Sequence, residues 1–335
     1  LKTVTPPPSP VPSPKKPTNA ICVGHLRSLE KTPITVRADD LTTHAAFLGS
    51  SGSGKTTLAL HIIEQLALRG IPSILVDRKG DLCAYGAESS WQKPAYNAAA
   101  SDQKRQLQTS IEVGIYTPGE QRGRPLRIPV FPQDIVEASP QQRTKSARYA
   151  ANSLATMMRY KDTQSDKTRI AILTKAIEVL CSAHRRDLLI SDLVELIANS
   201  DPALVNAIGK LDTRNFSKLV EHLETLRINH EELFSVKAGG EAFSPGELLG
   251  IGQPGKTRIS IISTKFLGDT ATIDFWISRF LVELARYFSR RPAKELQAVI
   301  LFDEADIYLP ATRKPATKEP MMDLLRRARS AGLGV

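Results

Sequence analysis

The chain has 335 residues, of which 41% are hydrophobic and 24% charged, and a formal net charge of +10 at pH 7. Its length allows one large domain or two ordinary ones, and no apolar run approaches the roughly 20 residues that span a membrane. The three cysteines are scattered, which indicates reduced thiols in a cytoplasmic protein instead of a disulfide or zinc framework.

Residues 1–20 consist mostly of proline, serine, threonine and lysine, a composition typical of an extended polyproline spacer. Two alternating stretches follow, 21–26 and 34–41, and we predict that they are strands beside a larger sheet. The first residue is leucine, and we therefore expect a further segment before it.

A glycine-rich loop follows. Residues 49–56, GSSGSGKT, fit G-x-x-x-x-G-K-[ST] at every fixed position. The apolar run 45–48 predicts a buried strand before the loop, and apolar residues at helical spacing up to Gly70 predict a helix after it. Glycines let the backbone wrap a triphosphate, so that N–H groups and the helix start point at it.

Within this loop, Lys55 is expected to reach the β- and γ-phosphates of ATP, and Thr56 to help hold Mg²⁺. A serine–glycine linker that contains Gly-Lys by chance is the alternative. The candidate nucleotide-binding residues are Gly49, Ser50, Ser51, Gly52, Ser53, Gly54, Lys55, Thr56 and Thr57.

A second apolar run, 73–76, ends in Asp77-Arg78-Lys79-Gly80-Asp81. Open α/β sheets bind ligands at the carboxyl ends of their strands. We therefore expect Asp77 either to orient water or metal at the site or to pair with Arg78 or Lys79.

The middle of the chain changes character. Residues 111–116 and 127–131 are predicted as short strands, and amphipathic helices then dominate, at 147–160, 167–184, 191–199 and 216–233. We predict an α/β core with a mainly parallel sheet, 21–138 and 248–335, interrupted by a helical insertion, 139–247. The positive charge lies on the core segments, which fits a polyanion beside them and fits generic solubility nearly as well.

The last third supplies two carboxylates. Residues 258–264 predict a strand, and 270–289 predict a long helix whose aromatic residues belong to the core. The apolar run 298–302 then ends in Asp303 and Glu304. Asp303 is expected to hold Mg²⁺ through water, and Glu304 to polarise the attacking water. A nucleotide-dependent switch with slow turnover is the alternative to a hydrolytic ATPase.

Three stretches, GSSGSGKTTLALHIIEQLALRGIPSILVDRKGD, VILFDEADIYLP and LLRRARSAGLG, resemble the HerA–FtsK superfamily of ring-forming DNA-pumping ATPases, and most of all its HerA branch. The resemblance covers 21–83 and 257–335. It implies a hexameric ring of RecA-like cores, ATP between subunits, and double-stranded DNA through the centre. It also implies that Arg329 reaches into the neighbouring subunit's site, and Arg326 and Arg327 are the alternative candidates for this role. Helix-surface ion pairs are the alternative role for these arginines.

Relatives carry a β-barrel ahead of this core and a polar sensor residue on a strand after RSAGLG. That strand should begin at Gly334-Val335, so we expect the 335 residues to be part of a longer chain. The candidate DNA contacts are in the loop 310–320, with Arg78 and Lys79 as a second group; a solvated loop is the alternative. The loop candidates are Arg313, Lys314 and Lys318.

These features predict an ATP-driven double-stranded DNA translocase or helicase, a homohexamer of the prokaryotic cytoplasm without membrane insertion. By resemblance, we expect a nuclease or other effector as partner, in DNA-end processing or anti-phage defence. One rival is a non-motor ATPase ring that assembles and gates an effector. Another is a secretion or conjugation motor.

Overall fold

The computed structural model describes residues 19–28, 30–92, 98–133, 138–183, 188–234, 240–252 and 255–335. The predicted spacer, 1–20, falls outside them except for Asn19 and Ala20.

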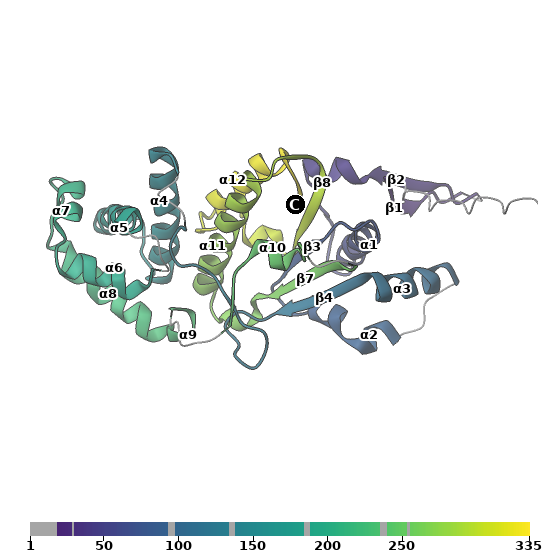
Figure 1. The fold of residues 1–335 in the computed structure, drawn as a ribbon, viewed down its shortest axis with the longest axis horizontal. Helices are drawn as coiled ribbons and strands as arrows, with labels where there is room; N and C mark the ends of the chain where they lie inside the picture. Colours follow the sequence, from purple (N-terminus) through teal and green to yellow (C-terminus); the bar gives the residue numbers. More distant parts are fainter. Residues whose placement is uncertain are drawn as a thin grey trace, which may run out of the picture.

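A five-stranded sheet forms the centre of the molecule (Figure 1), and all its neighbouring strands are parallel. This confirms the predicted α/β class with a mainly parallel sheet. In spatial order the strands are β4 (Ile111–Tyr116), β7 (Thr257–Ser263), β3 (Ser73–Asp77), β8 (Ala293–Phe302) and β9 (Ala331–Gly334).

Helices cover both faces of the sheet, which is why the central strands β3 and β7 are buried along almost their whole length. On one face, Leu75 and Ile261 pack in a cluster with Ile63 of α1 (Lys55–Ala67) and Leu107 of α3 (Ala98–Ser110). On the other face, α11 (Thr270–Ser289) and α12 (Lys318–Ala328) lie side by side (Figure 1). The aromatic residues of α11 belong to the core, as expected: Trp276 and Phe280 are buried and stacked.

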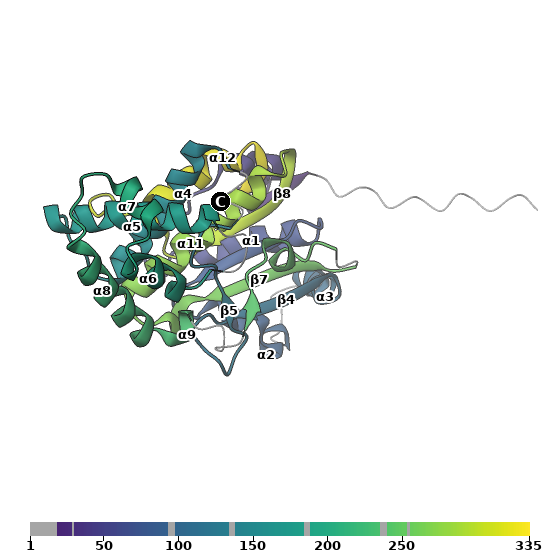
Figure 2. The ribbon, with the colours of Figure 1, turned by 60° about the vertical axis from the view of Figure 1, so that its left-hand side comes forward.

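The helices predicted between residues 139 and 247 lie on the α11 side of the molecule in both views (Figures 1 and 2). Its helix α4 packs against α11, and one hydrophobic cluster runs from the sheet into these helices. The division of the chain at 138 and 247 therefore stays a prediction about domain organisation. The helices are α4 (Pro140–Met157), α5 (Gln164–Ala183), α6 (Ile190–Ala198), α7 (Pro202–Ile208), α8 (Asn215–Asn229) and α9 (Glu231–Phe234).

Smaller elements connect these layers. An antiparallel hairpin, β1 (Ala20–His25) and β2 (Pro33–Arg37), lies beside α1, where the Gln65 side chain bonds both the N–H and the carbonyl of Cys22. The others are η1 (Ala38–Thr43), η2 (Leu82–Gly86), α2 (Glu88–Gln92), β5 (Leu126–Arg127), β6 (Glu241–Ala242), α10 (Pro245–Leu248), η5 (Thr264–Leu267) and η6 (Ala305–Ile307).

Several predicted strands have other bounds in the structure, and β8 begins at Ala293 instead of 298. The strand predicted at 34–41 ends at Arg37, because the Arg37 N–H donates to the Asp40 carboxylate and the chain turns into η1. The strand predicted at 127–131 is reduced to the two residues of β5, since Pro129 has no N–H for a ladder. The strand expected to begin at Gly334 begins three residues earlier, because β9 occupies Ala331–Gly334 beside β8.

The strand predicted at 45–48 is also wrong as a buried ladder strand. Its one backbone bond to the sheet runs from the Ala45 N–H to the Val335 carbonyl, at 3.0 Å, and Leu48 is 91% exposed.

Candidate active site

The glycine-rich loop lies at the carboxyl edge of the sheet. Helix α1 runs antiparallel to the strands, because Ala67 near its carboxyl end accepts a hydrogen bond from Thr257 at the start of β7. Its 13 residues rise by roughly 20 Å, about the length of the strands it covers. Lys55, at the opposite end of α1, is thereby brought to the edge where β3 and β8 end.

Two glycines give the loop its shape. Gly52 and Gly54 have φ of 74° and 88°, which favours glycine, and a Cβ on either would meet nothing within 4 Å. Gly49 is restricted by packing, since a Cβ there would lie 2.5 Å from Ser53 Oγ. The loop thus combines a tight turn with open space in front of its backbone.

Lys55 is directed into this loop. Its ammonium group donates to the carbonyls of Gly49, at 2.8 Å, and Ser50, at 2.7 Å. Phosphate oxygens of a bound nucleotide would accept hydrogen bonds from this ammonium group as the two carbonyl oxygens do. Ser51, Thr56 and Thr57 belong to the same loop and the first turn of α1, beside the amino-terminal end of the helix dipole.

Two carboxylates reach the same edge from β8. The Asp303 N–H donates to Val76 of β3, so the strand pairing fixes the backbone where the acids begin. Burial raises the pKa of Asp303, and the neighbouring Glu304, Asp77 and Asp81 raise it further, while Lys79 opposes them. A partly buried acid crowded by other acids favours a cation beside it.

Asp77 supports the turn after β3. It is fully buried, and its carboxylate accepts hydrogen bonds from the backbone of Gly80 at 2.8 Å, Leu82 at 2.9 Å and Cys83 at 3.3 Å. Neither of its predicted roles describes these contacts. The carboxylate holds the backbone of residues 80–83, and a role toward water or metal stays a prediction.

Arg78 and Lys79, which follow Asp77, serve different neighbours. Lys79 forms an ion pair with the Glu304 carboxylate. Arg78 instead lies near the buried Asp274 of α11 and the Tyr308 hydroxyl, with both of which it interacts electrostatically. One of the two predicted DNA contacts is thus engaged with the candidate base, and the other is directed into the protein.

The loop after β8 holds the other predicted DNA contacts. Lys318 donates to the carbonyl of Pro310 at 2.8 Å and so closes the loop on itself. Arg313 is exposed and interacts with Asp274, while Lys314 is exposed to solvent. Within this loop, Arg313 and Lys314 are the cations open to an external phosphate.

Arg329 lies at the opposite edge of the sheet. It follows the last turn of α12, next to Ser330, whose carbonyl accepts from Ala293 at the start of β8. The 10 residues of β8 separate this point from Asp303 by roughly 30 Å. Arg329, like the nearby Arg326 and Arg327, is exposed and lies far from the carboxylates of its own chain.

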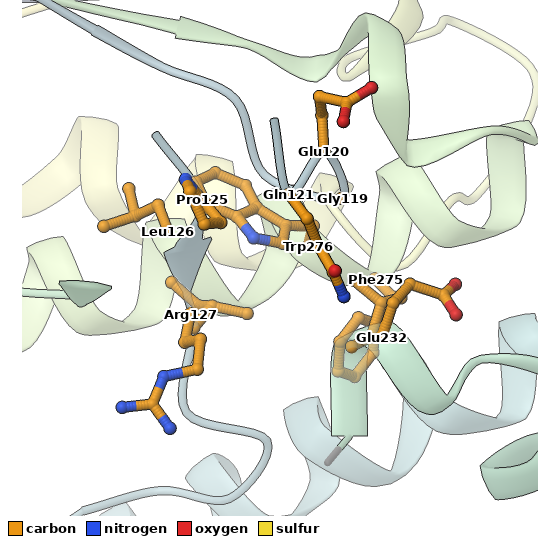
Figure 3. A pocket seen from close by; sticks show the side chains of 11 residues that line it. Gly119, Glu120, Gln121, Pro125, Leu126, Arg127, Glu232, Phe275 and Trp276 are labelled. Carbon is orange, nitrogen blue, oxygen red and sulfur yellow. The ribbon is translucent and has the colours of Figure 1, made fainter. Parts of the chain in front are cut away.

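Two cavities of the described part lie away from the glycine-rich loop. Arg327 lines a groove of about 350 Å³ between α4, α11 and α12. A smaller cavity, of about 20 Å³, lies around Trp276 (Figure 3), where Gln121 extends alongside the indole while Arg127 points away. None of the predicted site residues lines this smaller cavity.

The donor set at the carboxyl edge fits Mg–ATP. Among the described residues, no group of three or more histidine, cysteine or acidic side chains forms a metal site by itself. The Thr56 hydroxyl and Asp303 are hard oxygen donors, and Mg²⁺ is commonly held by such groups together with substrate phosphates. The open glycine loop, with Lys55 inside it, supplies the phosphate-binding part.

Three comparisons bear on these residues. The profile of a protein family described as "Helicase HerA, central domain" matches residues 21–233, more than half of the chain. No curated protein matches the chain in sequence. Within the described residues, every helix is too short or too polar to cross a membrane.

Solved structures with a similar fold include that of the bacterial conjugative coupling protein TrwBdeltaN70 in its unbound monoclinic form. It has a TM-score of 0.53 and 14% identity, with 96% of this chain covering 66% of that chain, slightly less than two thirds. VirB4 of Thermoanaerobacter pseudethanolicus has a TM-score of 0.54 and 13% identity, with 94% covering 75%. TrwB has also been solved with the ATP analogue ADPNP, at a TM-score of 0.51 and 15% identity, with 88% covering 63%.

These likenesses confirm the predicted RecA-like fold of P-loop NTPases. Sequence reasoning missed two features of the site. The Lys79–Glu304 ion pair joins two predicted residues, but no spacing in the sequence indicates it. Asp274 lies within a helical apolar stripe, where an acid contradicts the periodicity, and that exception was the available signal.

Proposed function

Because the chain belongs to the family of the central domain of the helicase HerA, we propose that it is an ATP-driven translocase or helicase of double-stranded DNA. The family and the similar folds are those of P-loop NTPases that bind ATP. The proposal adds hydrolysis, duplex DNA as substrate, a homohexameric ring and a cytoplasmic location, where prokaryotic DNA lies.

The observation that supports the proposal is that the start of α1, with Lys55, and the end of β8, with Asp303 and Glu304, lie toward the same edge of the sheet. The glycine loop and Lys55 bind the phosphates, and Thr56 and Asp303 hold the cation. Mg²⁺, when bound, supplies charge neutralisation on the transferred phosphoryl group. Glu304 orients the attacking water and accepts its proton.

Arg329 completes the site in the proposal. Its position at the opposite edge prevents it from reaching its own Lys55 edge, but it is exposed and available to a second copy of the chain. An arginine supplied in trans stabilises charge in the transition state and couples turnover between neighbours. This arrangement supports a ring with the nucleotide between subunits.

DNA contacts are proposed for Arg313 and Lys314 of the loop after β8, and for Lys79. Since these contacts would be to phosphates, binding is expected to be independent of sequence and to weaken steeply with salt. A nuclease or other effector partner, in DNA-end processing or defence, remains part of the proposal. The rivals are a non-motor ring that gates an effector and a motor for conjugation or secretion.

The test compares ATP hydrolysis with and without duplex DNA, and displacement of a blocked strand. The parent chain is expected to hydrolyse ATP faster with duplex DNA. Glu304→Gln is expected to retain ATP binding and to lose roughly 10²–10⁴-fold in turnover. The matched control is Glu295→Gln, an exposed glutamate near the other end of β8.

Each outcome assigns a function. Normal turnover in Glu304→Gln would overturn the assignment of the base. A rate of ATP hydrolysis that duplex DNA does not change, together with assembly on a partner protein, would favour the non-motor ring. Stimulation by a protein substrate in place of duplex DNA would favour a secretion motor.

A further inference from the structure

The candidate base is held by a cation from the neighbouring strand. Lys79, in the turn after β3, forms an ion pair with Glu304 Oε1 at the end of β8. The side chains of Lys79 and Glu304 are 58% and 30% exposed, so the pair faces solvent at the nucleotide edge. The ammonium group occupies one oxygen of the carboxylate and the space in front of it, so it competes with an attacking water for that oxygen.

Both backbones that carry this pair are fixed by their surroundings. Asp77 bonds the backbone of Gly80, Leu82 and Cys83, and Gly80 has a φ of 89°. Glu304 is itself left-handed, with φ of 57° and ψ of 50°, an uncommon conformation for a residue with a Cβ that tends to mark functional positions. The pairing therefore follows from two rigid turns on adjacent strands.

The charges around Lys79 explain why the ammonium stays there. Glu304 raises the pKa of Lys79 most, and Asp303 and Asp81 raise it further. Lys79 is thus a permanent cation among three acids, and more than half of its side chain is open to solvent. Solvent-exposed ion pairs are weak, so another anion can compete for the lysine.

We propose that Lys79 is a positioning residue that withholds Glu304 from water when no polyanion is bound, and that phosphates of duplex DNA draw Lys79 away and release the base. The inference rests on the proposed function and adds its regulation. DNA binds the state with a free lysine better than the paired state, which is the differential affinity that such a switch requires.

The test uses Lys79→Met, which removes the charge, and Lys79→Arg, which keeps it. The matched control is Lys265→Met, because the Lys265 stem lies against Gly80 and no ion pair reaches its ammonium in the described part of the chain. ATP turnover is measured for each full chain without and with duplex DNA, together with KM for ATP and the melting temperature.

Without DNA, Lys79→Met is expected to raise kcat roughly 2- to 5-fold, the range for loss of an exposed ion pair, at unchanged KM. The ratio of kcat with duplex DNA to kcat without it should fall by the same factor. Lys79→Arg, which keeps the charge, should restore the low DNA-free kcat and the stimulation by DNA that Lys79→Met loses, and Lys265→Met should behave as the parent does. Unchanged or lowered DNA-free kcat in a folded Lys79→Met chain would overturn the inference alone, whereas a parent without ATPase activity would overturn the proposed function as well.

Discussion

The buried Asp274 makes the stability of this protein depend on pH. Only 4% of the residue is exposed, and within the described residues its Oδ1 has no hydrogen-bond partner. Burial raises the pKa of Asp274 from 3.8 to about 6, and Asp269 adds to this, while Arg313 and Arg78 oppose it. The Tyr308 hydroxyl, whose own pKa Asp274 raises, also lies near it.

The sign follows from the direction of the shift. The folded chain binds this proton more tightly than the unfolded chain, so this contribution to stability is complete below pH 3.8 and is lost as the pH rises through about 6. One pKa unit corresponds to about 1.4 kcal/mol, so the contribution changes by about 2 kcal/mol between pH 8 and pH 4.5.

The perturbation is Asp274→Asn, which cannot titrate. The assay is urea unfolding of parent and variant at pH 8 and pH 4.5. The free energy of unfolding of the parent, minus that of the Asp274→Asn variant, is expected to rise by about 2 kcal/mol on going to the lower pH.

The control is Asp162→Asn, because the Asp162 side chain is 91% exposed and its removal should give a difference that hardly changes with pH. A difference for Asp274→Asn that stays constant within about 0.5 kcal/mol, or changes in the opposite direction, would refute the reasoning.

Two further predictions concern arginines. Arg329→Ala should retain ATP binding and lose turnover, and mixing it with Lys55→Ala should restore part of the activity, since mixed neighbours contain one intact site; no recovery would remove Arg329 from a shared site. Arg279→Met should lower the free energy of unfolding by about 1–3 kcal/mol, because it removes one partner of the buried Glu283, which keeps its ion pair with Arg286, and removes the Arg279 donor from the Pro129 carbonyl; a urea titration that shows a loss under about 0.5 kcal/mol would contradict this.

The sequence predicts most of the core because the hydrophobic residues of its strands and helices follow regular spacings. The strand β3 and the second half of β8 contain continuous apolar runs, β7 alternates isoleucine with polar residues, and the apolar stripe of α11 predicts its observed bounds, 270–289. Prediction fails where one backbone group decides: Pro129 shortens a strand, and Arg37 with Asp40 turns another into η1. These effects depend on single hydrogen bonds, which hydrophobic patterning does not record.

The candidate site divides in the same way. The loop around Lys55 and the acids after β8 follow from motifs whose spacing reflects one requirement, the close approach of backbone and charge to phosphate. The contacts of Lys79 and Asp77 depend on how two turns from separate strands meet. Such a meeting depends on strand order, which only the three-dimensional structure supplies.

The polarity of the sheet sets how copies of the chain can join in the proposed ring. Lys55 lies at one edge and Arg329 at the other, so a contact that unites them places unlike surfaces face to face and repeats head to tail. An open row of such copies always has one fewer complete site than it has chains. Closure into a circle supplies the missing site, and bound nucleotide would therefore favour closed assemblies over open ones.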